Sequence, residues 1–140
     1  MPIATADPTE YASDAADTHA VTMPATGNAG DLLLMFVITT VDVTVTGWTQ
    51  MFTTDIGISQ VIGFKKTAVG DEFGSTVTLD PAGSPKLTAH VFKVTGWGKD
   101  LTTHVVAGTT ATGADTTPEP PDVTHGFTTD VLSITIVGVQ

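Results

Sequence analysis

The sequence predicts an all-β protein, an antiparallel β-sandwich or jelly-roll-like domain. Its strongest signal is the uninterrupted apolar run Leu32–Ile38, which follows the turn-forming pair Gly30 and Asp31. A membrane-spanning helix needs about 20 apolar residues, so this run is too short to cross a bilayer. Most residues at positions 39–46 are β-branched, and such side chains suit a pleated sheet better than a helix. We therefore expect a central strand at Leu32–Ile38 with both faces covered.

The chain before this strand divides into an arm and a first strand. Residues 1–17 are small, polar and acidic and contain two prolines, so they predict an extended N-terminal arm. Residues 18–140 then form the β-sandwich domain. Polar and apolar residues alternate over 18–23, which predicts a strand that ends at Pro24. Residues 25–31 contain two glycines, an asparagine and an aspartate and predict the turn into the central strand.

Four further strands follow at short intervals. We expect one to begin at Gly47, and the others to cover residues 58–68, 75–79 and 87–95. Turn signals rich in Gly, Asp and Pro separate them at residues 54–57, 69–74 and 80–85. Short strands with turn signals between them are typical of sandwiches and jelly rolls.

The C-terminal part, from residue 104 onward, differs from the rest of the chain in composition. Residues 104–108 predict a short strand, and residues 109–121, rich in Thr, Ala, Gly and Pro, predict an extended or irregular stretch. Residues 131–139 predict a strong apolar strand. An uncovered apolar edge promotes aggregation, so this strand either pairs centrally or is covered by a neighbouring chain, unless the natural protein continues beyond residue 140.

Composition and charge exclude several classes of function. The formal net charge is −10, and the five basic residues are all lysines, scattered except for one adjacent pair. Nucleic acids and anionic membranes are bound by clustered cations, so neither is an expected partner. There is no cysteine, which excludes disulfides and thiolate metal sites. The N-terminus lacks the basic and apolar regions of a signal peptide, which predicts a protein made and kept in a cytoplasm or packaged there.

The sequence predicts no catalytic, cofactor-binding or metal-binding residue, and therefore no enzyme. The four histidines do not show the spacing of a metal site on a helix or a strand. Two acidic groups allow a calcium-binding loop, but calcium takes about six to eight oxygen ligands and no EF-hand pattern is present, so surface carboxylates are the favoured interpretation. The four histidines are His19, His90, His104 and His125. The first acidic group is Asp71, Glu72 and Asp80, and the second is Asp115, Glu119 and Asp122.

Two tryptophans are the candidate ligand or interface residues. Trp48 and Trp97 both follow a Thr-Gly pair, which places each ring beside a turn. One interpretation is that an exposed ring stacks on a sugar, as in carbohydrate-binding β-sandwiches. The favoured interpretation is that each ring caps the core at a corner of the sandwich. Exposure of either ring beside polar side chains distinguishes the two.

The order of these motifs resembles a β-rich domain of structural proteins of tailed bacteriophages, found in head-decorating, fibre and tail proteins. The resemblance runs from about Val21 to Val139. Members of this family place the Asp-Val-Leu strand in mid-domain, whereas here it ends the chain, which leaves open a domain that is incomplete at its C-terminus. The motifs that carry the resemblance are Val21–Thr22, Gly30–Leu34, Gly47–Thr49, Lys66–Ala68, Phe92–Gly96 and Asp130–Leu132.

What this resemblance implies is a non-enzymatic component of the virion, assembled in the host cytoplasm. The first expectation is an accessory capsid protein (a decoration, cement or head-fibre subunit) that binds the major capsid protein or another virion protein and forms a homo-oligomer. A tail-associated protein is the second. A carbohydrate-binding module that uses an exposed tryptophan is the alternative from another class, and an enzyme is a distant third.

Overall fold

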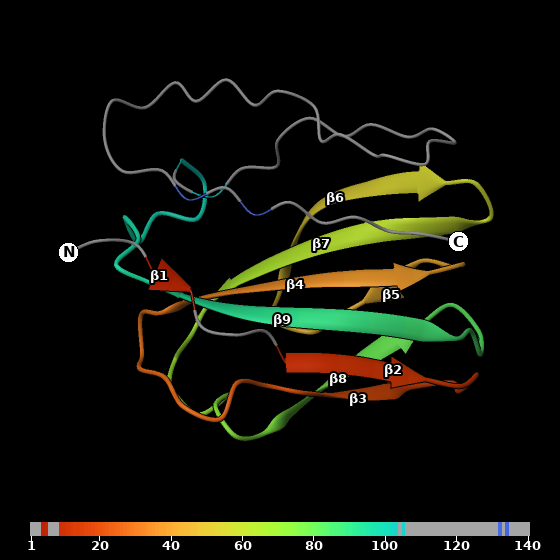
Figure 1. Cartoon of the computed structure of the whole chain (residues 1–140), viewed down its shortest axis with the longest axis horizontal. Coiled ribbons are helices and arrows are strands. Elements are labelled where there is room, and N and C mark those ends of the chain that lie inside the picture. Colours follow the sequence, from red (N-terminus) through yellow and green to blue (C-terminus); the bar gives the residue numbers. More distant parts are fainter. Residues whose placement is uncertain (1–3, 6–8, 104, 106–131, 133, 135–140) are drawn as a thin grey trace.

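The computed structural model describes residues 4–5, 9–103, 105, 132 and 134, and these residues contain strands and loops but no helix. Two antiparallel sheets pack together, which confirms the predicted β-sandwich. Figure 1 shows β6, β7, β4, β9 and β2 following one another across the larger sheet. The strands of the larger sheet are β1 (Ala4–Thr5), β2 (Thr9–Ser13), β4 (Leu32–Thr39), β6 (Thr49–Ile56), β7 (Ser59–Thr67) and β9 (Leu87–Thr95).

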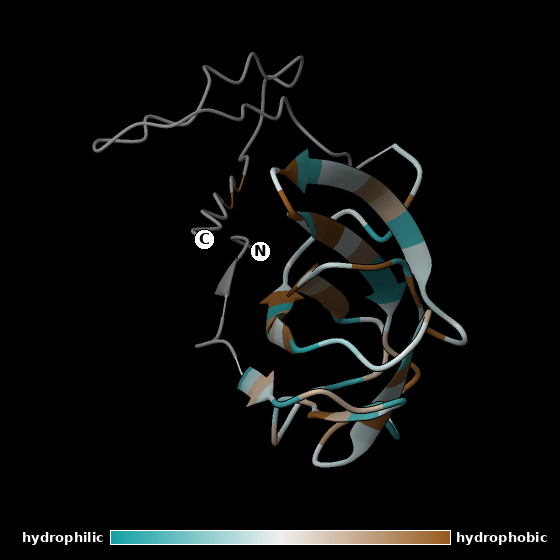
Figure 2. Cartoon of the chain, turned by 90° about the vertical axis from the view of Figure 1, so that its right-hand side faces the viewer, coloured by the Kyte–Doolittle hydropathy of each residue, from teal (hydrophilic) through white to brown (hydrophobic). Residues whose placement is uncertain are grey.

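The smaller sheet has three strands in the order β3–β8–β5, namely β3 (His19–Thr22), β8 (Thr76–Pro81) and β5 (Val43–Thr44). Along β3 and β8, buried residues that face the core alternate with exposed residues that face water, as in a sheet with one solvated side. Strands of both sheets carry strongly apolar residues, as Figure 2 shows.

Strand β4 is the central strand that the sequence predicts. It lies between β7 and β9 with both faces buried, and the expectation for Leu32–Ile38 is confirmed. Met35 and Val37 point into the space between the sheets, whereas Leu34 and Phe36 belong to a second apolar cluster on the outer face of the larger sheet. A strand with apolar cover on both sides needs no alternation, which is why the run is continuous.

The core between the sheets is aliphatic with one phenylalanine. Its fully or nearly fully buried members come from both sheets, so neither sheet can separate without exposing them to water. They are Val21, Met23, Met35, Val37, Val43, Val45, Ile62, Phe64, Leu79, Leu87, Ala89 and Val91.

The predicted turn before β4 has the expected chemistry. Gly30 has a φ of +90°, which glycine adopts without a steric penalty. The Asp31 carboxylate accepts a hydrogen bond of 2.9 Å from the Asn28 amide. The Gly30 amide donates to the Ala68 carbonyl at 2.8 Å, and the Ala68 amide donates to the Asp31 carbonyl at 2.8 Å, so this turn is tied to the end of β7.

The turn between β6 and β7 lies further along the chain than residues 54–57. Strand β6 continues to Ile56, which pairs with Ser59 across a two-residue loop. Gly57 has a φ of +80° at the first position of this loop, as the primed turns of tight hairpins require. The other loop residue, Ile58, is 81% exposed.

The described part of the N-terminal arm includes two strands of the larger sheet. Strands β1 and β2 both pair antiparallel with β9, so the described residues of the arm are ordered by their own chain. Strand β8 runs two residues beyond the expected end, because Pro81 pairs with Val43 of the short strand β5. Proline is tolerated at the end of a strand, where no ladder donor is needed. The sequence did not predict β5 as a separate strand.

The predicted strand at residues 104–108 lies outside the described residues except for Val105, and the irregular stretch at 109–121 lies wholly outside them. The predicted strand at 131–139 is described only at Leu132 and Ile134.

Candidate functional site

Trp97 is buried beside the outer face of the larger sheet. Its side chain is 7% exposed and packs in the cluster with Leu34 and Phe36. The indole N–H donates a hydrogen bond of 2.8 Å to the Gly30 carbonyl, so the polar tip is satisfied inside the protein. This ring offers no free face for a sugar, and its position favours a structural role.

Trp48 is half-buried and packs against the core between the sheets. Its indole nitrogen is buried and has no hydrogen-bond partner among the described residues. Gly47 and Gly96, which precede the two tryptophans, have φ of +79° and +74°. The repeated Thr-Gly-Trp motif thus forms two turns with left-handed glycines, yet one ring enters the inner core and the other enters the outer cluster.

His19 is the most buried polar side chain in the described part of the chain, with 1% exposure. Its Nδ1 lies 2.5 Å from the Ser13 hydroxyl and 3.3 Å from the Tyr11 hydroxyl, while its Nε2 is buried without a described partner. A nucleophilic serine needs a base that a third group orients, and no described carboxylate contacts this imidazole. The contacts instead tie β2 of the larger sheet to β3 of the smaller one. The sequence predicted no such role, because Tyr11 and Ser13 lie in the arm.

The other candidate ligands do not gather into a metal site within the described ranges. His90 is partly exposed, and its Nδ1 lies 3.8 Å from Glu10. No group of three or more His, Asp or Glu side chains there could hold a metal ion. The remaining candidates, His104, His125, Asp115, Glu119 and Asp122, lie outside the described residues.

We predict that chelator treatment leaves the melting temperature unchanged, because the sequence has no metal-ligand spacing and the described residues form no ligand group. Thermal unfolding of the full chain with and without EDTA measures this. A drop in melting temperature with EDTA that added calcium restores would contradict the prediction and identify an acidic loop as an ion site.

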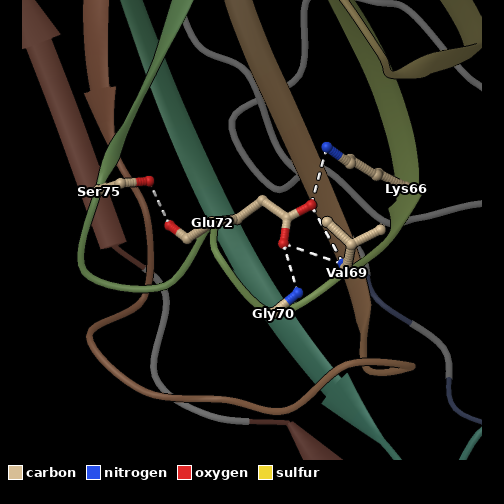
Figure 3. Close-up of polar contacts among 5 residues, drawn as sticks. All are labelled: Lys66, Val69, Gly70, Glu72 and Ser75. Carbon is tan, nitrogen blue, oxygen red and sulfur yellow. Dashed lines mark hydrogen bonds and ion pairs between the residues drawn. The ribbon is translucent and has the colours of Figure 1, made fainter.

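Glu72 is a buried carboxylate in the connection between β7 and β8. It accepts hydrogen bonds from the Val69 and Gly70 amides at 3.0 and 2.9 Å, and it forms an ion pair of 2.8 Å with Lys66 (Figure 3). Burial by itself raises the pKa of Glu72, but the hydrogen bonds from Lys66 and Gly70 outweigh it, so the pKa falls from 4.5 to about 2. The contacts of Glu72 therefore fix the loop that joins the two sheets, and they indicate a structural role rather than ligand binding.

The outward face of the smaller sheet carries exposed threonines. Thr22 pairs with Thr76, and Ala20 pairs with Thr78, so hydroxyls and methyls cover this face. A shallow hollow of about 410 Å³ lies on the same sheet, and its described lining contains no aromatic ring on which a sugar could stack. Its lining residues are Thr18, Thr44, Thr46, Val77, Thr78 and Asp80.

The outer face of the larger sheet is apolar and aromatic. The Phe36 ring lies 6.3 Å from the Phe52 ring and 5.9 Å from the Phe92 ring, between centroids. Phe52 also covers Gly63, where an added Cβ would lie 2.4 Å from the phenylalanine ring. Glycine at position 63 therefore permits this aromatic group. We define the outer-face cluster as Leu32, Leu34, Phe36, Met51, Phe52, Phe92 and Val94 with the residues packed on them, Trp97, Leu101, Val105 and Ile134.

One end of the sandwich is more acidic than the other. The strand registers place five carboxylates at the end where β4 finishes, and one lysine accompanies them. Lys86 pairs there with the Asp14 carboxylate at 3.1 Å. The other end carries Lys66, Lys93 and Lys99 together with the carboxylates Asp31, Asp71 and Glu72, and Lys66 is paired with Glu72. The five carboxylates are Asp14, Asp17, Asp42, Asp55 and Asp80.

Comparison with known proteins gives no relative. No family model, curated protein sequence or solved structure matches this chain. In the part of the chain that the structure describes, no helix has the length and apolar character to cross a membrane. Within the described residues the geometry consists of structural ties and of the outer-face cluster, which is the candidate site.

Proposed function

We propose that this protein is a non-enzymatic structural subunit of a bacteriophage particle. Its most specific form is an accessory capsid protein (a decoration, cement or head-fibre subunit) that binds capsid subunits and other copies of itself. The motif order from Val21 to Val139 supports the phage assignment by resemblance. A tail-associated protein would use the same surfaces.

The single observation that carries an adhesive role is the outer face of the larger sheet. In a two-layer sandwich this face normally meets water and carries polar residues. Here it carries the apolar and aromatic outer-face cluster. The chain itself covers this face, since Leu34 and Phe36 are only 8% and 6% exposed. Contact through it would require a partner to replace that cover, and a stable partner buries about 1,600 Å² in total.

The charge distribution supports an oriented contact. The acidic end of the sandwich would face a basic partner surface or water, and like charges would keep two acidic ends apart. Complementary charge affects orientation and association rate more than affinity, so this feature selects a partner's face rather than providing the binding energy.

We predict that the apparent stability of the purified full chain rises with its concentration or with added capsids, because binding to the folded state stabilises it by mass action. Sedimentation velocity and thermal unfolding over at least a hundredfold range of concentration measure this. Matched runs add empty phage capsids or an unrelated protein shell of similar size as a control. A folded monomer at every concentration, with a melting temperature that capsids leave unchanged, would contradict the proposed function.

A further inference from the structure

The hairpin of β6 and β7 ends in an exposed isoleucine. Ile56 pairs with Ser59, so Gly57 and Ile58 alone form the turn. Gly57 has a positive φ of +80° and Ile58 does not have a positive φ. This is the pattern of a type II′ turn, in which the first central residue is the one that must be glycine. The geometry of the turn therefore does not require isoleucine at position 58.

The Ile58 side chain contributes little to the packing of the domain. It is 81% exposed, more than either of the other large hydrophobic residues that are exposed in the described part of the chain. Turn positions favour Gly, Asn, Asp and Ser, so a polar residue would serve this turn at least as well. Single exposed apolar side chains are common on protein surfaces, and the residues around Ile58 therefore decide whether the tip forms a binding surface.

Two more isoleucines lie at the same end of the larger sheet. Ile56 pairs with Ser59, and Ile38 pairs with Val61, two residues further along β7. Both isoleucines are half-buried, and neither belongs to the inner core or to the outer-face cluster. A shallow hollow of about 290 Å³ lies beside the hairpin, and its lining includes Ile38 and Ser59. We define the tip patch as Ile38, Ile56 and Ile58.

The charges next to the tip patch are mainly negative. Asp55 is exposed and pairs with Gln60 across the hairpin. The Gln60 amide donates to the exposed Asp42 carboxylate at 3.4 Å, so two carboxylates lie close to the base of the turn. The lysine at this end, Lys86, forms an ion pair of 3.1 Å with Asp14. The tip patch is therefore an apolar surface with an acidic border.

We propose that the tip patch is a docking surface for another protein, one that presents an apolar pocket bordered by lysines or arginines. Ile58 would fill the pocket, and the carboxylates would orient the two surfaces. Anionic lipids and nucleic acids carry the wrong charge for this border, and a second copy would bring the same carboxylates against it. A two-residue turn at the end of a paired hairpin is preorganised, so binding costs little conformational entropy. This surface is separate from the outer-face cluster, and it would serve a partner of this chemistry whether or not that partner is a capsid.

The test uses a probe with the chemistry of the proposed partner. The probe is a synthetic amphipathic helical peptide of leucine and lysine, and the control peptide has the same length and charge with serine in place of leucine. Each peptide is titrated into the full chain at physiological salt, and the methyl signals of its isoleucines are followed by NMR. We expect the signals of Ile38, Ile56 and Ile58 to shift with the leucine peptide.

Two matched variants show whether Ile58 is the anchor. Ile58→Ser is expected to weaken binding of the leucine peptide about tenfold, the loss that corresponds to an apolar side chain of this size. Val69→Ser changes an apolar residue that is 67% exposed in the β7–β8 connection, and we expect it to leave the affinity within about twofold. Both positions are exposed, so the melting temperatures should match that of the natural chain.

Several outcomes would overturn the proposal. Equal affinities of the natural chain and Ile58→Ser for the leucine peptide would do so, and so would equal binding of the serine peptide, since charge alone would then explain the contact. Loss of self-association in Ile58→Ser, measured by sedimentation velocity, would identify a second copy as the occupant instead. Loss of binding to phosphatidylcholine vesicles in that variant would identify a membrane. A chain that binds the leucine peptide through Ile58 but ignores empty phage capsids would contradict the proposed function and leave the tip patch as a docking surface.

Discussion

Replacement of Leu34 by alanine is expected to lower the free energy of unfolding by about 2–5 kcal/mol, the range for removing a buried leucine side chain. Leu34 is 8% exposed on the central strand β4, between Phe92 of β9 and Lys65 of β7 in the register. Alanine would leave a cavity in the outer-face cluster that neighbours on two strands cannot fill without moving. A denaturant titration measures the loss as a shift of the midpoint.

Two companion variants show which face carries the stability. Met35→Ala removes a fully buried side chain from the inner core, and we expect a loss in the same range. Thr76→Ala changes an exposed position of β8, where surface substitutions typically stay within about 0.5 kcal/mol. A large loss for Met35→Ala with a loss below about 0.5 kcal/mol for Leu34→Ala would show that the outer face of β4 lacks its cover.

Acidification is expected to remove the stabilisation that Glu72 provides. Its pKa is about 2 in the folded protein and 4.5 as the ordinary value, so its contribution is fully present above pH 4.5 and is lost as the pH falls toward 2. At 1.36 kcal/mol per pKa unit this shift corresponds to about 3 kcal/mol. Lys66 is 23% exposed and partly screened by water, so we expect about 1–3 kcal/mol.

Glu72→Gln isolates this contribution because it keeps the shape of the side chain and removes its charge. We expect the variant to be less stable than the natural chain at pH 7 and the difference to shrink steadily below pH 4.5. Unfolding titrations at a series of pH values measure this difference. Asp71→Asn, at the exposed neighbouring carboxylate, serves as the control and should follow the natural chain. A difference for Glu72→Gln that stays constant down to pH 2.5 would contradict the assigned role.

These roles bear on the proposed function in different ways. Glu72 and His19 hold the two sheets together, through the β7–β8 connection and through β2, and neither contacts a candidate partner surface. The outer-face cluster is the surface to which the proposed function assigns partner contact, and its described cover includes Ile134 of the same chain. Loss of the contacts of Glu72 or His19 would therefore weaken the domain itself.

Local sequence pattern identified most strands of the sandwich, but not β1, β2 or β5. The unbroken apolar run identified β4 as a strand covered on both sides, and the Gly30–Asp31 pair identified the turn before it, because both signals depend on neighbouring residues alone. The alternation over residues 18–23 likewise identified the first strand of the smaller sheet. Composition by itself excluded thiol chemistry, and the spacing of the five lysines argued against a cluster of cations.

Tertiary structure alone decided which of these elements meet. Pairing of β1 and β2 with β9 depends on a partner edge more than seventy residues away, so the arm's composition could not reveal it. The same holds for Trp48 and Trp97, whose identical Thr-Gly-Trp settings lead to different clusters, and for Glu72, whose low pKa depends on where Lys66 and two backbone amides converge. Strand pairing, the burial of a side chain and the pairing of charges all depend on contacts between residues that are distant in the sequence. A local pattern does not encode such contacts.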